Sequence, residues 1–105
     1  MEFQALQRRA AEVRELYAQH ETGRYGRAWT REELMLGFVG DMGDLAKLAL
    51  AAEGVRAIPD AQGKLAHELA DCLWSLMTLA RMHEVDLEAS FLSVMDELEA
   101  RLRPA

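Results

Sequence analysis

The sequence predicts an all-α fold built from four helices. Apolar residues recur every three or four positions along almost the whole chain, which is the period of an amphipathic helix. Only two of the 105 residues are proline, Pro59 and Pro104, and both fall where a helix would end or begin. A chain of this length forms one domain, so we expect a single domain over residues 1–105.

The first helix is expected over about residues 2–20. Its apolar stripe should lie along the side that carries Phe3, Leu6, Ala10 and Val13. Gly23 and Gly26 should then break the helix, leaving the basic and aromatic residues 24–29 as a connection.

The second helix should open at Thr30. Glu33 follows three residues later, and this spacing is typical of a capping box, in which each side chain bonds the other residue's backbone N–H. The helix should run to about Glu53, with Gly54 as its terminating residue.

The last two helices are separated from the second by residues 55–59. This segment should be extended, because the residue before a proline avoids the helical region. The third helix should begin at Asp60 or Gln62 and end near His83. Asp86 is the expected N-cap of a fourth helix over about 87–102.

The second and third helices carry apolar residues on more than one face. Such helices must be covered on several sides, which four short helices in one chain can hardly achieve. We therefore predict a four-helix bundle completed by homodimerisation through these two helices.

The composition excludes several functions. A net charge of −6 and an isoelectric point near 5.0 argue against a nucleic-acid partner, which would require a basic surface. No apolar run approaches the roughly 20 residues of a membrane span, so no membrane partner is expected. A single cysteine, Cys72, excludes an internal disulfide, and the first residues lack a signal-peptide pattern. We expect a cytoplasmic protein.

Two pairs of acids are the main candidates for a functional site. Asp41 and Asp44 lie in the second helix, and Glu68 and Asp71 lie in the third, each pair with i,i+3 spacing. This spacing places both acids of a pair on one helix face. Ionised carboxylates in apolar stretches are costly unless a cation neutralises them. If the two helices face one another, the four oxygen-bearing side chains suit Mg²⁺, with Mn²⁺ as an alternative. The competing interpretation is a solvated acidic stripe or a set of salt bridges.

Around these acids the sequence resembles a known family. The run Gly40-Asp-Met-Gly-Asp-Leu-Ala-Lys47, the later run His67-Glu-Leu-Ala-Asp-Cys-Leu-Trp74 and the segment Val85-Asp-Leu-Glu-Ala89 are similar to those of MazG-like all-α nucleoside triphosphate pyrophosphohydrolases. Small single-domain members, including dCTP pyrophosphatases, are the nearer likeness. The resemblance extends over about residues 30–101.

This resemblance implies a homodimer, or a dimer of dimers, with Mg²⁺ held at Asp41, Asp44, Glu68 and Asp71. It further implies cleavage of a (deoxy)nucleoside triphosphate into a monophosphate and pyrophosphate, with Glu68 and Asp71 as catalytic residues. The chain departs from the family at Lys47, where an acid is frequent, and at Val94 and Leu98, where phosphate-binding residues are frequent.

Five further residues are candidates for substrate contacts. Trp29 and Tyr25 could stack on a nucleobase, although an aromatic residue before an N-cap also serves as a hydrophobic staple. Lys47, Lys64 and Arg101 could bind phosphate, although long basic side chains near helix ends are also commonly solvated. His67-Glu68 lacks the second histidine of a zinc-protease motif.

The sequence therefore predicts a Mg²⁺-dependent nucleotide pyrophosphohydrolase. The alternative is a non-catalytic helical protein of the same fold that binds a nucleotide or a protein partner without turnover.

Overall fold

A computed structural model describes residues 2–104, and this part of the chain is entirely helical outside its connections and ends. The helices are α1 (Phe3–Tyr25), α2 (Arg31–Ala52), α3 (Ala61–Met82) and α4 (Leu87–Leu102). The all-α, four-helix prediction is therefore confirmed. None of the described helices is long and apolar enough to cross a membrane.

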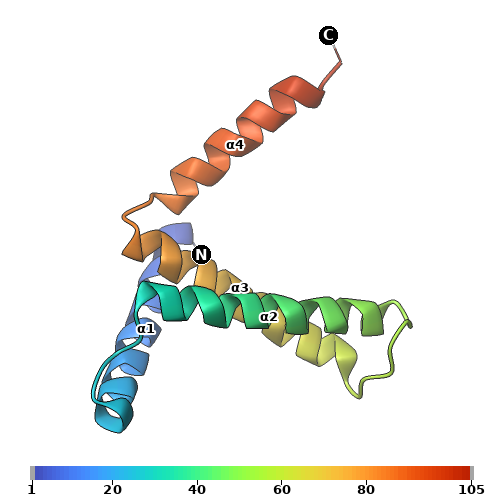
Figure 1. Cartoon of the computed structure of the whole chain (residues 1–105). Helices are drawn as coiled ribbons and strands as arrows, with labels where there is room; N and C mark the ends of the chain where they lie inside the picture. Colours follow the sequence, from blue (N-terminus) through green and yellow to red (C-terminus); the bar gives the residue numbers. More distant parts are fainter. Residues whose placement is uncertain (1, 105) are drawn as a thin grey trace.

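Helices α2 and α3 form an antiparallel hairpin, the closest packed pair in the chain (Figure 1). The buried residues of α2 are Leu34, Phe38 and Leu48, and those of α3 include Cys72 and Met77. Helix propensity alone would leave such helices marginal in water, so this shared apolar face supplies most of their stability.

Helix α1 crosses the hairpin near the C-terminal end of α3 (Figure 1). The indole N–H of Trp74 donates a hydrogen bond of 3.2 Å to the carbonyl oxygen of Ala10. The ring of Tyr17 tilts against the Trp74 ring, with 5.5 Å between the ring centres. The half-buried Trp74 thus joins α3 to α1 through a hydrogen bond and a ring contact.

The predicted helix caps are largely confirmed. Thr30 and Glu33 form the full capping box, and the Asp86 side chain accepts from the Ala89 N–H at 3.0 Å. The predicted end of the first helix was wrong. The helix continues past Gly23 to Tyr25 and ends at Gly26, whose φ of 82° is a left-handed conformation that glycine adopts without strain.

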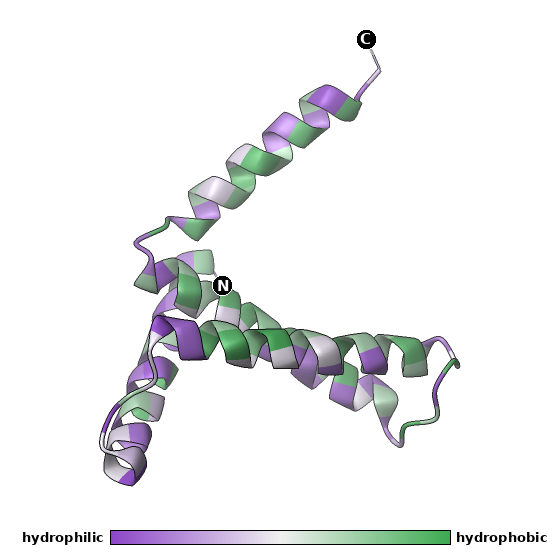
Figure 2. Cartoon of the chain, viewed as in Figure 1, coloured by the Kyte–Doolittle hydropathy of each residue, from purple (hydrophilic) through white to green (hydrophobic). Residues whose placement is uncertain are grey.

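Helix α4 points away from the other three helices (Figure 1) and has no buried residue. Apolar and polar residues alternate along it (Figure 2). Its large exposed apolar side chains are Phe91, Leu92, Val94, Met95 and Leu102. One chain alone therefore leaves this helix without a packing partner.

Candidate metal centre

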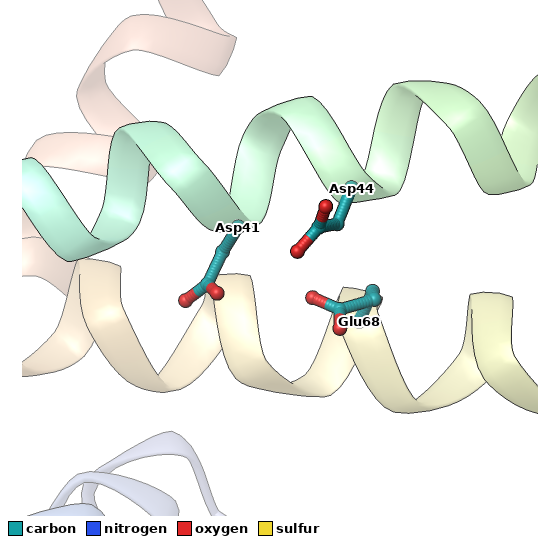
Figure 3. Close-up of side chains that lie close together, drawn as sticks. All are labelled: Asp41, Asp44 and Glu68. Carbon is teal, nitrogen blue, oxygen red and sulfur yellow. The ribbon is translucent and has the colours of Figure 1, made fainter.

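The acids of the two motifs lie where α2 and α3 run side by side. Asp41 and Asp44 lie one turn apart in the middle of α2, and Glu68 lies in the second turn of α3. The antiparallel hairpin brings these turns opposite one another, and the three side chains point toward a common space between the helices (Figure 3).

The three carboxylates are close enough to share one cation. One oxygen from each of Asp41, Asp44 and Glu68 lies within 4.8 Å of the other two. Asp41 and Glu68 are half-buried, whereas Asp44 is exposed. The cluster is therefore open to solvent on the Asp44 side, as a site that exchanges water and substrate must be.

Burial and mutual repulsion disfavour the charged forms of these acids. Burial raises the pKa of Asp41, and the neighbouring charges of Asp71 and Asp44 raise it further. Burial likewise raises the pKa of Glu68, followed by repulsion from Asp41, Asp71 and Asp44. In the described part of the chain, none of the three clustered acids forms a salt bridge with a basic side chain.

One oxygen of the cluster lacks a hydrogen-bond partner altogether. The Oε2 atom of Glu68 is buried, and no donor within residues 2–104 reaches it. A buried carboxylate oxygen without a donor is costly, and a cation would satisfy it. Three carboxylates without a counter-charge, one with this orphaned oxygen, fit a hard divalent ion such as Mg²⁺.

The fourth predicted acid, Asp71, lies beside this cluster but outside the group of three. Its Oδ2 atom pairs with Nε2 of His67 at 3.2 Å, one turn back along α3. Its charge also raises the pKa of Asp41. Burial, followed by repulsion from Asp41, Glu68 and Asp71, also raises the pKa of the neighbouring Cys72 thiol, which keeps that thiol protonated.

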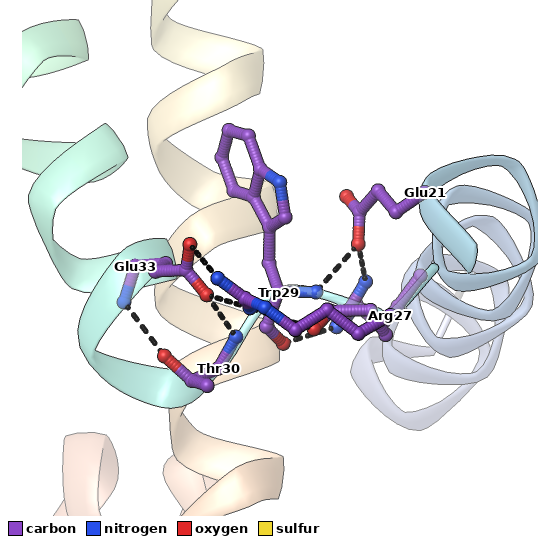
Figure 4. Close-up of polar contacts among 7 residues, drawn as sticks. Glu21, Arg27, Trp29, Thr30 and Glu33 are labelled. Atoms are coloured by element: carbon purple, nitrogen blue, oxygen red, sulfur yellow. Dashed lines mark hydrogen bonds and ion pairs between the residues drawn. The ribbon is translucent and has the colours of Figure 1, made fainter. Parts of the chain in front are cut away.

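The connection before α2 is fixed by a buried ion pair that the sequence analysis did not identify (Figure 4). Arg14 and Glu21 of α1 lie 3.2 Å apart, with side chains only 14% and 9% exposed. Glu21 accepts the backbone N–H of Trp29 at 2.9 Å, and Arg14 donates to the Trp29 carbonyl oxygen at 2.9 Å. The only sequence signal was the i,i+7 spacing of two opposite charges on one helix face.

The Trp29 ring lies against α2. A methyl group at Gly37 would approach the indole within 3.7 Å, so the ring covers this glycine. Gly37 is one helical turn before Asp41, and Trp29 as a residue is still 41% exposed. Trp29 therefore presents an open aromatic surface next to the acidic cluster.

The remaining predicted site residues lie in two places. Tyr25, the last residue of α1, is exposed and has the Arg24 guanidinium 5.6 Å above its ring centre. Lys47 and Lys64 line a hollow beside the acids, together with Asp44 and Glu68. Arg101 belongs to the last turn of α4, which points away from α2 and α3 (Figure 1).

Comparison with protein families bears on this site. The model of the MazG nucleotide pyrophosphohydrolase domain matches residues 49–103, just over half of the chain. The chain belongs to the MazG family. The matched segment contains Glu68, Asp71 and all of α4, and it begins five residues after Asp44. No curated protein and no solved structure matches the chain.

The fold brings together acids that lie inside and outside the matched segment. Asp41 and Asp44 precede the segment that matches the MazG domain, yet the hairpin brings both acids to Glu68. The acidic cluster of this MazG chain thus joins a residue inside the matched segment to two residues outside it.

Proposed function

We propose that the protein is a Mg²⁺-dependent hydrolase that converts (deoxy)nucleoside triphosphates to monophosphates and pyrophosphate. Membership of the MazG nucleotide pyrophosphohydrolase family supports the class of reaction. The observation that carries the proposal is the cluster of Asp41, Asp44 and Glu68, in which a buried oxygen of Glu68 has no donor within the described residues.

In this proposal Asp41, Asp44 and Glu68 hold the ion, and Asp71 joins them by turning away from His67. When bound, Mg²⁺ would lower the pKa of a coordinated water and offset negative charge on the phosphate oxygens. Glu68 and Asp71 orient the attacking water from α3. A bond forms between the water oxygen and the α-phosphorus, and the bridging bond to the β-phosphate breaks. The bridging oxygen leaves with pyrophosphate, and the protons of the water pass to the products or to solvent.

The nucleobase is proposed to stack on Trp29. Trp29 is exposed, and Arg14 and Glu21 bond its backbone. Its indole lies against Gly37, which is one helical turn before Asp41. Stacking on an aromatic ring tolerates different bases, because every base has a π-face. Tyr25 is a second candidate, since its ring is also exposed.

The active form is proposed to be a homodimer, or a dimer of dimers. Helix α4 has no buried residue, and α2 and α3 retain large exposed apolar side chains. Arg101 points away from the acids of its own chain with the end of α4, so its proposed contact with phosphate requires a second copy.

Pyrophosphate release tests the catalytic assignment. Wild type should release pyrophosphate from at least one member of a panel of ribo- and deoxyribonucleoside triphosphates when Mg²⁺ is present. Glu68→Ala should lower this rate by at least about 100-fold, since the ion loses a ligand and with it several kcal/mol of transition-state stabilisation. Glu97→Ala, which removes an exposed acid of α4, is the matched control and should retain activity.

Two outcomes would contradict the assignment. Unchanged turnover in Glu68→Ala would exclude the acidic cluster as the catalytic centre. If wild type binds nucleotides but hydrolyses none of them, the non-catalytic binding protein becomes the better description.

A further inference from the structure

A hollow of about 290 Å³ adjoins the acidic cluster at the end of the hairpin where α2 finishes and α3 begins. Asp44 and Glu68, two acids of the cluster, line one side of the hollow. The buried Leu48 and the half-buried Ile58, which belongs to the connection between the helices, supply an apolar wall. An apolar wall lowers the local dielectric constant and strengthens any ionic contact made in the hollow.

Both lysines of the chain line this hollow. The sequence contains only these two lysines, Lys47 and Lys64. Lys47 follows Asp44 by three residues on α2, and Lys64 precedes Glu68 by four residues on α3. Because the helices are antiparallel, each lysine lies one turn from an acid toward the same end of the hairpin. In residues 2–104 neither ammonium group forms a salt bridge.

A histidine adjoins the lysines, and its Nε2 atom pairs with Asp71. His67 also lines the hollow, one turn after Lys64 on α3. A divalent ion at the carboxylates would offset two of their negative charges, so that the ion and the two lysines together would attract an anion. The hollow therefore suits a multiply charged anion that contacts the ion at one end and two ammonium groups at the other.

Trp29 lies on the opposite side of the acids. Its ring covers Gly37, which precedes Asp41 by four residues, whereas Lys47 follows Asp44 by three. At a rise of about 1.5 Å per residue, Gly37 and Lys47 are about 15 Å apart along α2, with the acids between them. The sequence of features along the helix is thus an aromatic surface, a cation site and a basic hollow.

We propose that the hollow between Lys47 and Lys64 seats the β- and γ-phosphates of the substrate and fixes its direction along α2. This inference rests on the proposed hydrolase function and adds the orientation. The base lies at Trp29, the α-phosphate lies at the acidic cluster, and the pyrophosphate leaving group occupies the hollow. A diphosphate would leave part of the hollow unfilled, so the two lysines select triphosphates over diphosphates.

Binding of inorganic pyrophosphate tests the seat without requiring turnover. Calorimetry with pyrophosphate and Mg²⁺ should show that Lys47→Ala and Lys64→Ala each weaken binding by about ten-fold, as expected for loss of a charge-assisted hydrogen bond. Arg9→Ala removes a positive charge from an exposed position of α1 and should bind as wild type. Trp29→Ala should also bind pyrophosphate as wild type, since it lies at the base end.

Turnover of matched triphosphates and diphosphates tests the selectivity. Lys47→Ala and Lys64→Ala should lower kcat/KM more for a triphosphate than for the diphosphate of the same nucleoside. Trp29→Ala should lower both alike, mainly through KM, because stacking acts on ground and transition states equally. Circular dichroism melting should show that the lysine variants fold, since both side chains are exposed.

The two proposals fail in different ways. If the Lys47→Ala/Lys64→Ala double variant binds Mg²⁺–pyrophosphate like wild type, the seat is excluded, whatever the catalytic result. If pyrophosphate binds at the lysines but no nucleotide is hydrolysed, the seat stands and the hydrolase function does not.

Discussion

The carboxylates of Asp41 and Glu68 lie where burial and neighbouring acids raise their pKa values. A raised pKa means that the folded chain holds these protons more tightly than the unfolded chain does. Between the ordinary carboxyl pKa, about 4, and the raised value, the folded state therefore binds more protons. The free energy of unfolding should fall as pH rises through this window, as long as no cation occupies the site.

Glu68→Gln tests this expectation at the level of one side chain. In a chelator, wild type should lose stability relative to the variant as pH rises from about 4 toward neutral, because only wild type acquires the extra buried charge. Millimolar Mg²⁺ at neutral pH should then raise the melting temperature of wild type but much less that of Glu68→Gln. Urea unfolding and melting curves at several pH values measure both effects.

The comparison must be made as a difference between the two proteins. Glu33 opposes the trend, because its hydrogen bonds with Arg27 and the Thr30 N–H lower its pKa to about 2. That stabilisation is lost as pH falls, equally in both proteins. Glu97→Gln on α4 serves as the control and should behave as wild type. An equal pH dependence in wild type and Glu68→Gln would contradict the electrostatic description of the cluster.

The sequence predicted four acids facing one another from two helices, and the structure gathers three of them, Asp41, Asp44 and Glu68. Spacing alone places Asp41 with Asp44 and Glu68 with Asp71, because i,i+3 residues share a helix face. Which acid of the second pair turns toward the first depends on the rotation of α3 against α2, which no local pattern encodes. Asp71 pairs instead with His67, its i,i+4 neighbour on the same helix.

At the scale of elements, the Arg14–Glu21 pair sets how α1 leads into α2. Glu21 is buried, the Arg14 side chain is only 14% exposed, and both bond the backbone of Trp29. A buried charge without its partner is costly, whereas an exposed pair such as Arg9–Glu12 contributes little. The position of the Trp29 ring therefore depends on a contact made inside α1.

Replacing Arg14 should destabilise the protein and loosen this connection. Arg14→Met leaves Glu21 charged and buried and should cost about 3 kcal/mol in the free energy of unfolding. Arg14→Met/Glu21→Leu should recover part of that loss, because the uncompensated charge is gone. Chemical denaturation gives the values, with Arg9→Met on the exposed pair as the control. If Arg14→Met were as harmless as Arg9→Met, the buried pair would not hold the connection.

Helix boundaries were predictable where a single side chain caps the start of the helix. Thr30 and Asp86 cap α2 and α4 as expected, because each bonds a backbone N–H three residues ahead. The end of α1 was missed because Gly23 is tolerated inside a helix at a cost of only about 1 kcal/mol. The helix must extend past residue 21 for Glu21 to reach both Arg14 and Trp29. Contacts between distant parts of the chain impose this requirement, and the local sequence does not reveal it.

At the scale of the whole molecule, one chain is less compact than its length allows. Its radius of gyration is 16.8 Å, against about 13 Å for a compact domain of about 100 residues. Helix α4 is unpacked, and a hollow of about 1030 Å³ lies between α1 and α3 beside the start of α4. The apolar residues on several faces of α2 and α3 had predicted that one chain alone cannot bury all of its apolar surface.

The proposed homodimer accounts for these exposed surfaces and can be tested directly. On α3 the exposed residues Leu69, Leu73 and Leu76 form one stripe with i,i+4 and i,i+7 spacing. Leu73→Glu should break an interface made by this stripe, because a carboxylate buried against apolar residues has no counter-charge. Leu16→Glu on α1 places the same charge at an exposed apolar position outside α2 and α3 and should have little effect.

Sedimentation equilibrium at micromolar concentration measures the outcome. Wild type and Leu16→Glu should show at least twice the 11.8 kDa of one chain, whereas Leu73→Glu should shift toward a single chain. Helical circular dichroism of Leu73→Glu distinguishes dissociation from unfolding, since α2 and α3 still pack against each other within one chain. A wild type that sediments at 11.8 kDa would exclude the dimer and, with it, any contact of a partner's α4 with the acidic cluster.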